Sequence, residues 1–243
     1  MPFSQRPAMR ILILSDLHAN LEAIQAIQAT EPGWDELWVL GDLVNYGPDP
    51  AEAVEFVRRH ATAVVRGNHD HALGYGAGPR CSAAFRQMAR VMQGYTAAML
   101  SEEQKGWLRE LPLTASREIG GESFFLCHAA PSDPLYAYLP PDPDVWKQQL
   151  ADIQAGTVLV GHTHLPLVLE ANGRRLVNPG SVGQPKQGAP EACYALWEDG
   201  RLTLKSSRYE VEATVRKVLA LPIEAETREA LAAVLRTGRP PSP

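Results

Sequence analysis

The sequence predicts an α/β fold, and two patterns along the chain support this class. From the N-terminus, short apolar runs alternate with stretches whose apolar residues recur at helical spacing, which indicates alternating strands and helices. From about Thr114 the apolar runs are instead joined by hairpin turns, which predict further strands. The 243 residues contain no internal repeat and no interdomain linker. We therefore expect a single domain over residues 1–243, with a core at about 10–208 and a C-terminal helix and tail at about 209–243.

The elements of the first half follow from apolar runs, caps and spacing. The run "ILIL" predicts a buried strand, and Asn20 is a good N-cap for the helix that follows it. Residues 49–60 predict a second helix, with Pro50 in its first turn. Residues 82–110 predict a mainly helical segment beside the site. We expect its methionines to fill the core: Met88, Met92 and Met99.

The second half carries two strong hairpin signals. Asn172-Gly173 separates the two apolar runs of "LVLEANGRRLVN", and Asp199-Gly200 does the same in "YALWEDGRLTLKSS". We expect these hairpins to build a second sheet. Residues 225–235 predict the final helix, and "TGRPPSP" predicts a frayed tail.

Five apolar runs end in a polar group of a narrow chemical range. The runs lead into "SDLH", "GDLVNYG", "GNHD", "CHA" and "GHTH", which contain Asp, Asn and His at the key positions. A single His-x-His pair such as His162 and His164 could simply make hydrogen bonds in a loop, although in an extended chain both side chains would face one side. Ligands of α/β folds collect where the carboxyl ends of strands meet. The repetition over five runs therefore predicts a metal cluster.

These five segments, in this order, resemble the signature segments of the calcineurin-like metallophosphoesterase superfamily. Tyr46-Gly47-Pro48 and residues 178–181 resemble its small bacterial and archaeal phosphodiesterase branch. The resemblance covers roughly residues 10–185 and implies an αββα sandwich of two mixed β-sheets flanked by helices, with two metal ions. It implies that one ion is held by Asp16, His18 and His164, the other by Asn68, His128 and His162, and that Asp42 bridges the two.

Two cations about 3.5–4 Å apart can clamp a phosphate and acidify a shared water, which leaves a hydroxide in line with the leaving group. A carboxylate at position 42 suits the bridge because its two oxygens can serve both ions. We interpret His69 as the proton donor to the leaving group and Asp70 as the group that orients its imidazole. The alternatives are a structural histidine and a helix cap.

The substrate is less defined than the metal site. Protein phosphatases of the superfamily have Asp-Arg where this chain has Asn45-Tyr46, which favours a phosphodiesterase over a phosphoserine phosphatase. Asn45 and Tyr46 are candidate substrate contacts, or else a turn residue and a packing aromatic. Tyr136 and Tyr138 could stack on a base or merely pack. A phosphomonoesterase, a dinucleoside-polyphosphate hydrolase and a non-catalytic interaction module remain as alternatives.

Composition limits the cofactors and partners. Ligation by His, Asp and Asn without thiolate suits two divalent ions, with Mn first and Fe, Zn or Ni as alternatives. The net charge of −5 predicts no non-specific nucleic-acid binding, and the substrate is expected to be a small phosphate ester such as a nucleotide. No apolar stretch predicts a membrane span or a signal peptide, and three widely spaced cysteines suit reduced thiols, so we expect a cytoplasmic protein. Homo-oligomer formation is left open.

Overall fold

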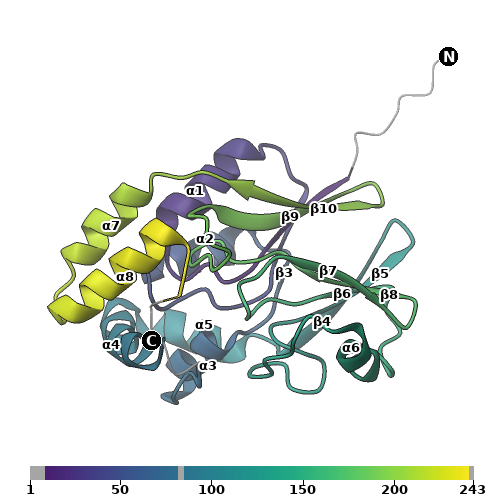
Figure 1. Ribbon diagram of the computed structural model, residues 1–243, viewed down its shortest axis with the longest axis horizontal. Coiled ribbons are helices and arrows are strands. Elements are labelled where there is room, and N and C mark those ends of the chain that lie inside the picture. The colour runs from purple at the N-terminus through teal and green to yellow at the C-terminus, as the bar shows by residue number, and fades with distance from the viewer. Residues whose placement is uncertain (1–8, 82–84, 241–243) are drawn as a thin grey trace.

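The computed structural model describes residues 9–81 and 85–240 and contains two five-stranded sheets packed face to face, with helices outside them (Figure 1). In sheet A the order is β10-β9-β1-β2-β3, and in sheet B it is β4-β5-β6-β8-β7. Sheet A contains β1 (Arg10–Leu14), β2 (Glu36–Val39), β3 (Ala63–Val64), β9 (Ala192–Glu198) and β10 (Arg201–Ser207). Sheet B contains β4 (Thr114–Ile119), β5 (Glu122–Cys127), β6 (Thr157–Leu159), β7 (Leu167–Ala171) and β8 (Arg174–Asn178).

Both sheets mix parallel and antiparallel pairs, as expected. Strands β1, β2 and β3 are parallel, whereas β9 is antiparallel to β1. In sheet B, β5, β6 and β8 are parallel, and β4 and β7 pair antiparallel at its edges. The carboxyl ends of the parallel strands therefore lie at one end of each sheet, where loops can bring side chains together.

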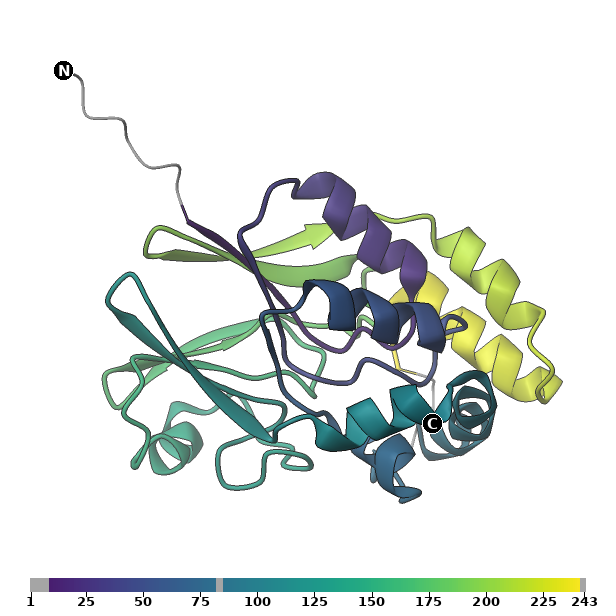
Figure 2. The same cartoon turned by 180° about the vertical axis from the view of Figure 1, so that it is seen from behind.

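The helices form the two outer layers. Their bounds are α1 (Leu21–Thr30), α2 (Pro50–His60), α3 (Asn68–Tyr75), α4 (Arg86–Met99), α5 (Glu102–Glu110), α6 (Pro143–Gln149), α7 (Val211–Leu219) and α8 (Ala225–Thr237). Helix α6 lies apart from the others, against sheet B (Figure 2). The predicted αββα sandwich is thus confirmed.

Alternation along β1 explains the layers. Ile11 and Ile13 face sheet B, where they join Trp38 and Phe124 in the core between the sheets. Leu12 points to the other side, into the cluster formed with α1 and α2. Since successive strand residues point to opposite faces, a run that is apolar throughout must be covered on both sides.

Several predicted elements agree with the structure in detail. Asn20 caps α1 by accepting a hydrogen bond from the Ala23 N–H, and Pro50 occupies the first turn of α2. Both hairpin turns have positive φ angles at their two central residues, as a type I′ turn requires. In the β7–β8 turn these angles are 53° at Asn172 and 67° at Gly173. Helices α4 and α5 lie within the predicted 82–110 segment, of which residues 82–84 are outside the described part.

Three expectations are corrected. Of the two predicted hairpins, only β7–β8 belongs to sheet B, because the β9–β10 hairpin extends sheet A beside β1. Residues 192–197 of β9 are all buried, which suits an interior strand. Met99 is 49% exposed and so is not core filler, unlike the buried Met88 and Met92. The C-terminal region holds α7 as well as α8, and residues 241–243 of the expected frayed tail are outside the described part.

Candidate metal centre

Loops that follow five strands bring the seven predicted ligands together at one end of the sandwich. The loops after β1, β2 and β3 belong to sheet A, and those after β5 and β6 belong to sheet B. All seven side chains are buried, with at most 3% of any residue exposed. They are Asp16, His18, Asp42, Asn68, His128, His162 and His164.

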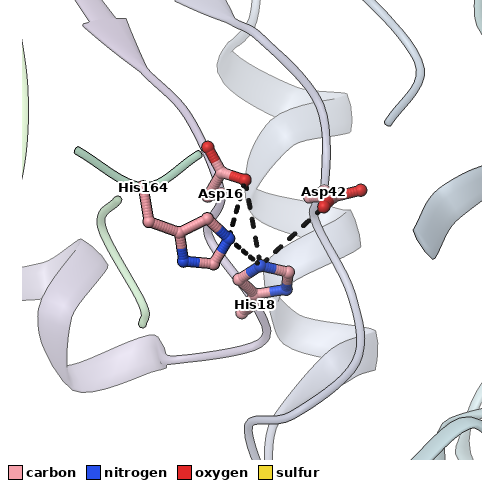
Figure 3. Close-up of side chains that lie close together, drawn as sticks. All are labelled: Asp16, His18, Asp42 and His164. Atoms are coloured by element: carbon pink, nitrogen blue, oxygen red, sulfur yellow. Dashed lines mark hydrogen bonds and ion pairs between the residues drawn. The ribbon is translucent and has the colours of Figure 1, made fainter. Parts of the chain in front are cut away.

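The first group of ligands surrounds Asp16 (Figure 3). Its Oδ1 lies 3.2 Å from Nε2 of His164 and 3.9 Å from Nε2 of His18, and the two Nε2 atoms face each other at 3.2 Å. Asp16 Oδ1 has no hydrogen-bond partner although it is buried. An unpartnered buried carboxylate oxygen between two imidazoles fits a cation.

The second group surrounds His128. Its Nε2 lies 3.0 Å from Oδ1 of Asn68 and 3.2 Å from Nδ1 of His162. The Asn68 amide N–H donates to the carbonyl of Pro79 across 2.6 Å, which turns Oδ1 toward the site. The orientation of Asn68 is thus fixed as a neutral oxygen ligand requires.

Asp42 lies between the two groups. Its Oδ2 is 3.8 Å from Nε2 of His18 and 3.3 Å from Nε2 of His128. Its other oxygen accepts a hydrogen bond from the backbone N–H of His69 at 2.8 Å. One carboxylate oxygen therefore faces members of both ligand sets.

Three of the four imidazoles are oriented by backbone carbonyls. Nδ1 of His18 donates to Val44, that of His128 to Leu40, and that of His164 to Gln184, at 3.0, 2.7 and 2.6 Å. With the proton on Nδ1, the lone pair of Nε2 points into the site. Such outer hydrogen bonds select the tautomer that binds a metal.

The backbone of these loops is left-handed at the ligands. The φ angles are 53° at Asp16, 43° at His18, 54° at Asp42, 65° at His162 and 63° at His164. Residues other than glycine seldom adopt positive φ, and such positions cluster at functional sites. The His162-x-His164 segment is therefore a turn and not an extended chain, and its two imidazoles belong to different candidate ligand groups.

Two glycines allow the loops to approach closely. A Cβ at Gly67 would overlap the carboxylate of Asp42, and a Cβ at Gly161 would overlap the side chain of Ser15. The glycines of "GNHD" and "GHTH" are thus required by packing between loops from different strands.

Residues 9–199 match the calcineurin-like phosphoesterase superfamily domain. The chain belongs to this superfamily. Its members include metal-dependent phosphoesterases, so the chain is a hydrolase of the metallophosphoesterase kind, as the sequence resemblance indicated.

Individual relatives agree with this assignment. The structure of a metallophosphoesterase from Sphaerobacter thermophilus is 32% identical, covers 95% of this chain and 99% of its own, and superposes with a TM-score of 0.80. An uncharacterized protein of Methanocaldococcus jannaschii is 29% identical over 86% of this chain and 91% of its own length. The symmetrical bis(5′-nucleosyl)-tetraphosphatase of Thioalkalivibrio sulfidiphilus is 32% identical over 174 residues. That match covers 67% of this chain and 57% of the tetraphosphatase.

The electrostatics of this metallophosphoesterase site favour positive charge at its centre. Burial raises the pKa of Asp42, but attraction to His128 and His69 outweighs it and holds the pKa well below the ordinary value. Burial lowers the pKa of His128, but Asp42 raises it to about 9. Burial and the charge of His128 lower the pKa of His162 to about 3. A proton and a metal ion compete for the same nitrogen. The raised pKa of His128 therefore indicates that positive charge is stabilised at this imidazole.

Two groups of acidic and imidazole ligands have donor atoms close enough to hold a metal ion. The first is Asp16, His18, Asp42 and His164, and the second is Asp42, His128 and His162. Nitrogen and oxygen donors without thiolate suit a divalent transition ion. The residues present therefore fit the metal dependence of the superfamily.

The structure places His69 beside the ligands and gives it a different partner than expected. Its ring lies 5.2 Å from the ring of His18, and Asn45 Nδ2 donates to its Nδ1 across 2.7 Å. A neutral imidazole that accepts at Nδ1 carries its proton on Nε2. Burial lowers the pKa of His69 to about 4, partly offset by Asp42.

Asp70 does not orient the His69 imidazole. Its carboxylate accepts hydrogen bonds from the backbone N–H groups of Asp42, Leu43 and Gly67 at 2.8, 2.9 and 3.0 Å. The hydrogen bond from Gly67 is the helix cap that the sequence offered as the alternative role. The other two hydrogen bonds join the loop after β2 to the first turn of α3. Asn45 takes the orienting position beside His69 and is fully buried.

A narrow pocket opens onto the ligands. Its lining includes Tyr46 and Tyr138, and the Tyr138 ring lies 4.0 Å from that of His162. Tyr136 instead packs beside the Arg80 guanidinium at 4.8 Å. Three lining residues were missed by sequence reasoning, Cys81, Phe85 and Lys186. None follows an apolar run, so only the folding of distant segments onto the site reveals them.

Lys186 brings a positive charge to this pocket. Its Nζ lies 4.4 Å from the centre of the Phe85 ring, and burial lowers its pKa to about 8. Attraction to Asp16 and Asp42 partly offsets this lowering. A half-buried cation that faces the proposed ligands suits a site that binds an anion.

Proposed function

We propose that this chain hydrolyses a phosphodiester at a centre of two divalent metal ions. The observation that carries the proposal is the position of Asp42, whose Oδ2 faces His18 of one ligand group and His128 of the other. A bridging carboxylate at this point would add a shared ligand to the three on each side. Asp16, His18 and His164 would hold one ion, and Asn68, His128 and His162 the other.

The ligand chemistry supports manganese first, with iron, zinc or nickel as alternatives. Two such ions, when bound, polarise a phosphate and lower the pKa of water, and so supply the nucleophile. The protein would supply the rest: a buried site with little water, oriented ligands, and a group to assist departure of the alcohol.

His69 is proposed as the group that donates to the leaving oxygen. Asn45 occupies Nδ1, so the proton is directed to Nε2, and the ring is part of the pocket lining. Its low pKa in the free protein makes the imidazole neutral at pH 7, whereas the negative charge of a bound phosphate favours the protonated form. Asp70 would act as a positioning residue, since it fixes the backbone of Asp42.

The substrate is proposed to be a small phosphate ester, with Tyr46 and Lys186 among its contacts. A dinucleoside-polyphosphate hydrolase is the second candidate. It is favoured by relatives named symmetrical bis(5′-nucleosyl)-tetraphosphatase. This chain matches between about a quarter and somewhat over half of their length, 24% in Azotobacter vinelandii and 57% in Thioalkalivibrio sulfidiphilus.

The test compares two diesters that differ in the leaving group. His69→Ala should lower kcat/KM for an alkyl or nucleoside diester by roughly 10²–10⁴-fold. An activated nitrophenyl diester should lose much less, because nitrophenolate departs without a proton. Metal content, measured by elemental analysis, should stay at the wild-type value in this variant.

His71→Ala is the matched control, because it removes a histidine from the same helix whose ring packs on Tyr75. It should leave the ratio of the two rates near the wild-type value. Equal losses on both diesters in His69→Ala would refute proton donation and assign His69 to binding. Absence of metal-dependent turnover on every diester and dinucleoside polyphosphate tested would refute the proposed function itself.

A further inference from the structure

A hollow of about 380 Å³ adjoins the metal pocket and is lined by arginines. Its lining residues are Gly78, Pro79, Arg80, Cys81, Arg86 and Arg90. Cys81 also lines the metal pocket, and Phe85 of that pocket directly precedes Arg86 in the chain. The arginine hollow is therefore a neighbour of the reacting centre.

The positive charge of the arginine hollow is not compensated. Arg80, Arg86 and Arg90 are exposed, and none has a carboxylate within ion-pair distance among the described residues. Elsewhere some arginines, such as Arg58, Arg175 and Arg236, pair with a glutamate, and others do not, so the hollow is distinguished by three guanidinium groups in one place. Arg80 lies over the Tyr136 ring, and in a chain of net charge −5 the three guanidinium groups concentrate positive charge locally.

The arrangement on α4 also has an energetic cost without a ligand. Arg86 and Arg90 are four residues apart on one helix, so they lie on the same face and repel each other. An anion between them would remove this repulsion. Guanidinium groups bind phosphate oxygens with paired hydrogen bonds, which makes phosphate the matching anion.

Positive groups continue from the hollow to the metal pocket. Lys186 lies 4.4 Å from the centre of the ring of Phe85, the residue that precedes Arg86. It lines the same pocket as Asp42 and His164. A substrate with its scissile phosphate at the metal ligands could thus extend past Lys186 and Cys81 toward the arginines.

We propose that the arginine hollow binds a second phosphate group of the substrate, beyond the phosphate that is hydrolysed. The preferred substrates would then be small molecules with two or more phosphates, such as dinucleoside polyphosphates. This inference rests on the proposed phosphoesterase function. The low overall basicity of the chain favours a small substrate over a nucleic-acid strand.

The experiment compares substrates with different numbers of phosphates. Metal-loaded protein is assayed on bis(4-nitrophenyl) phosphate, which has one phosphate, and on diadenosine polyphosphates with two, three and four. Wild type should prefer a diadenosine polyphosphate. Arg86→Ala combined with Arg90→Ala should lower the ratio of kcat/KM for that compound to kcat/KM for the nitrophenyl diester by roughly tenfold or more, mainly through KM.

The matched control is Arg174→Ala combined with Arg201→Ala, which removes two arginines from the opposite ends of the sheets. Arg174 begins β8, whose next residue pairs with the first residue of β6. Arg201 begins β10 and pairs with Glu198, which also pairs with the first residue of β1. Both therefore lie at the end of the sheets that is opposite to the metal centre. This control should keep the wild-type ratio. An unchanged ratio in the Arg86 and Arg90 variant, or an equal loss on all substrates, would overturn the second-phosphate site. If wild type turns over the nitrophenyl diester without such a ratio change, only this inference fails; if it turns over no substrate, the proposed function fails.

Discussion

Asp16 and Asp42 in the metal centre and Glu31 at the end of α1 are all buried carboxylates, yet their surroundings differ. Glu31 accepts hydrogen bonds from Arg10 at 2.6 Å and from the Tyr194 hydroxyl at 2.8 Å, and it also pairs with Lys205. We call these four residues the Glu31 cluster. Its negative charge is compensated by side chains of the same chain.

In the metal centre the acids are compensated only in part, through the raised pKa of His128 beside Asp42. Asp16 and Asp42 face imidazoles, and three of those, His18, His162 and His164, have their pKa lowered by burial. Asp16 Oδ1 and His162 Nε2 have no hydrogen-bond partner. One group of buried acids is therefore complete as folded, whereas the other fits ligands from outside, and this difference separates a structural ion pair from a binding site.

The backbone shows the same contrast. Asp16 and Asp42 have positive φ, whereas no residue of the Glu31 cluster does. Left-handed backbone at non-glycine residues costs free energy that packing must offset. The strain is concentrated where ligands are brought together and is absent where the charges only stabilise the fold.

The largest expected effect is that of Asp42→Asn, which removes the carboxylate shared by the two ligand groups. Metal affinity should fall in both sites by more than the 10–100-fold that loss of an outer partner typically costs. Elemental analysis after gel filtration would measure the loss. In wild type, chelation should lower Tm because bound metal stabilises the folded state, and in Asp42→Asn this difference should nearly disappear.

Two fully occupied metal sites in Asp42→Asn would contradict the bridging role. They would also contradict the contrast with the Glu31 cluster, because Asp42 would then be another carboxylate that the protein itself satisfies.

His164→Ala should have a smaller effect, confined mainly to one ion. His164 lies 3.2 Å from Asp16 Oδ1, whereas His128 and Asn68 belong to the other group. We expect metal content near one ion per chain, with the remaining ion weakened but retained. Equal loss of both ions, or no loss, would show that the ligands are not divided as proposed.

Much of the fold, and the residues that gather at the candidate metal centre, could be predicted from the sequence. Apolar runs and hairpin turns depend on local chemistry, so the strands and the Asn172-Gly173 turn could be predicted. The proposed ligands could be predicted because each lies in a short segment that follows an apolar run, as Asp16 does after β1 and His128 after β5, and because these segments resemble those of the superfamily.

Contacts between distant segments could not be predicted in this way. Hairpin chemistry specifies that β9 pairs with β10 but not which sheet they join, and that choice is made by pairing with β1, more than 180 residues earlier. Lys186 reaches the site through a loop without periodicity. The partners of Asp70 are backbone groups of another loop, which leave no signal in residue types.

The smallest expected effect is that of Glu31→Gln, which keeps the size of the side chain and removes its charge. The unfolding free energy at pH 7 should fall by about 2 kcal/mol, because Arg10 and Lys205 lose a charged acceptor. The loss should be equal with metal bound and after chelation, measured by urea unfolding. Glu118→Gln is the control, since Glu118 is exposed and its loss should stay within about 0.5 kcal/mol.

The pH dependence of that loss sharpens the comparison. Burial raises the pKa of Glu31, but the hydrogen bonds from Lys205 and Tyr194 outweigh it, so the pKa lies below its ordinary value of 4.5. Above 4.5 the carboxylate is ionised in both folded and unfolded chains, and its stabilisation is complete. As the pH falls below 4.5, the unfolded chain takes up a proton first, so the stabilisation declines and vanishes once the folded carboxyl is also protonated. The difference between wild type and Glu31→Gln should therefore shrink on acidification. A difference that grew toward low pH, or that depended on metal, would mean that the Glu31 cluster does not compensate its own charge and that the contrast with the metal centre is wrong.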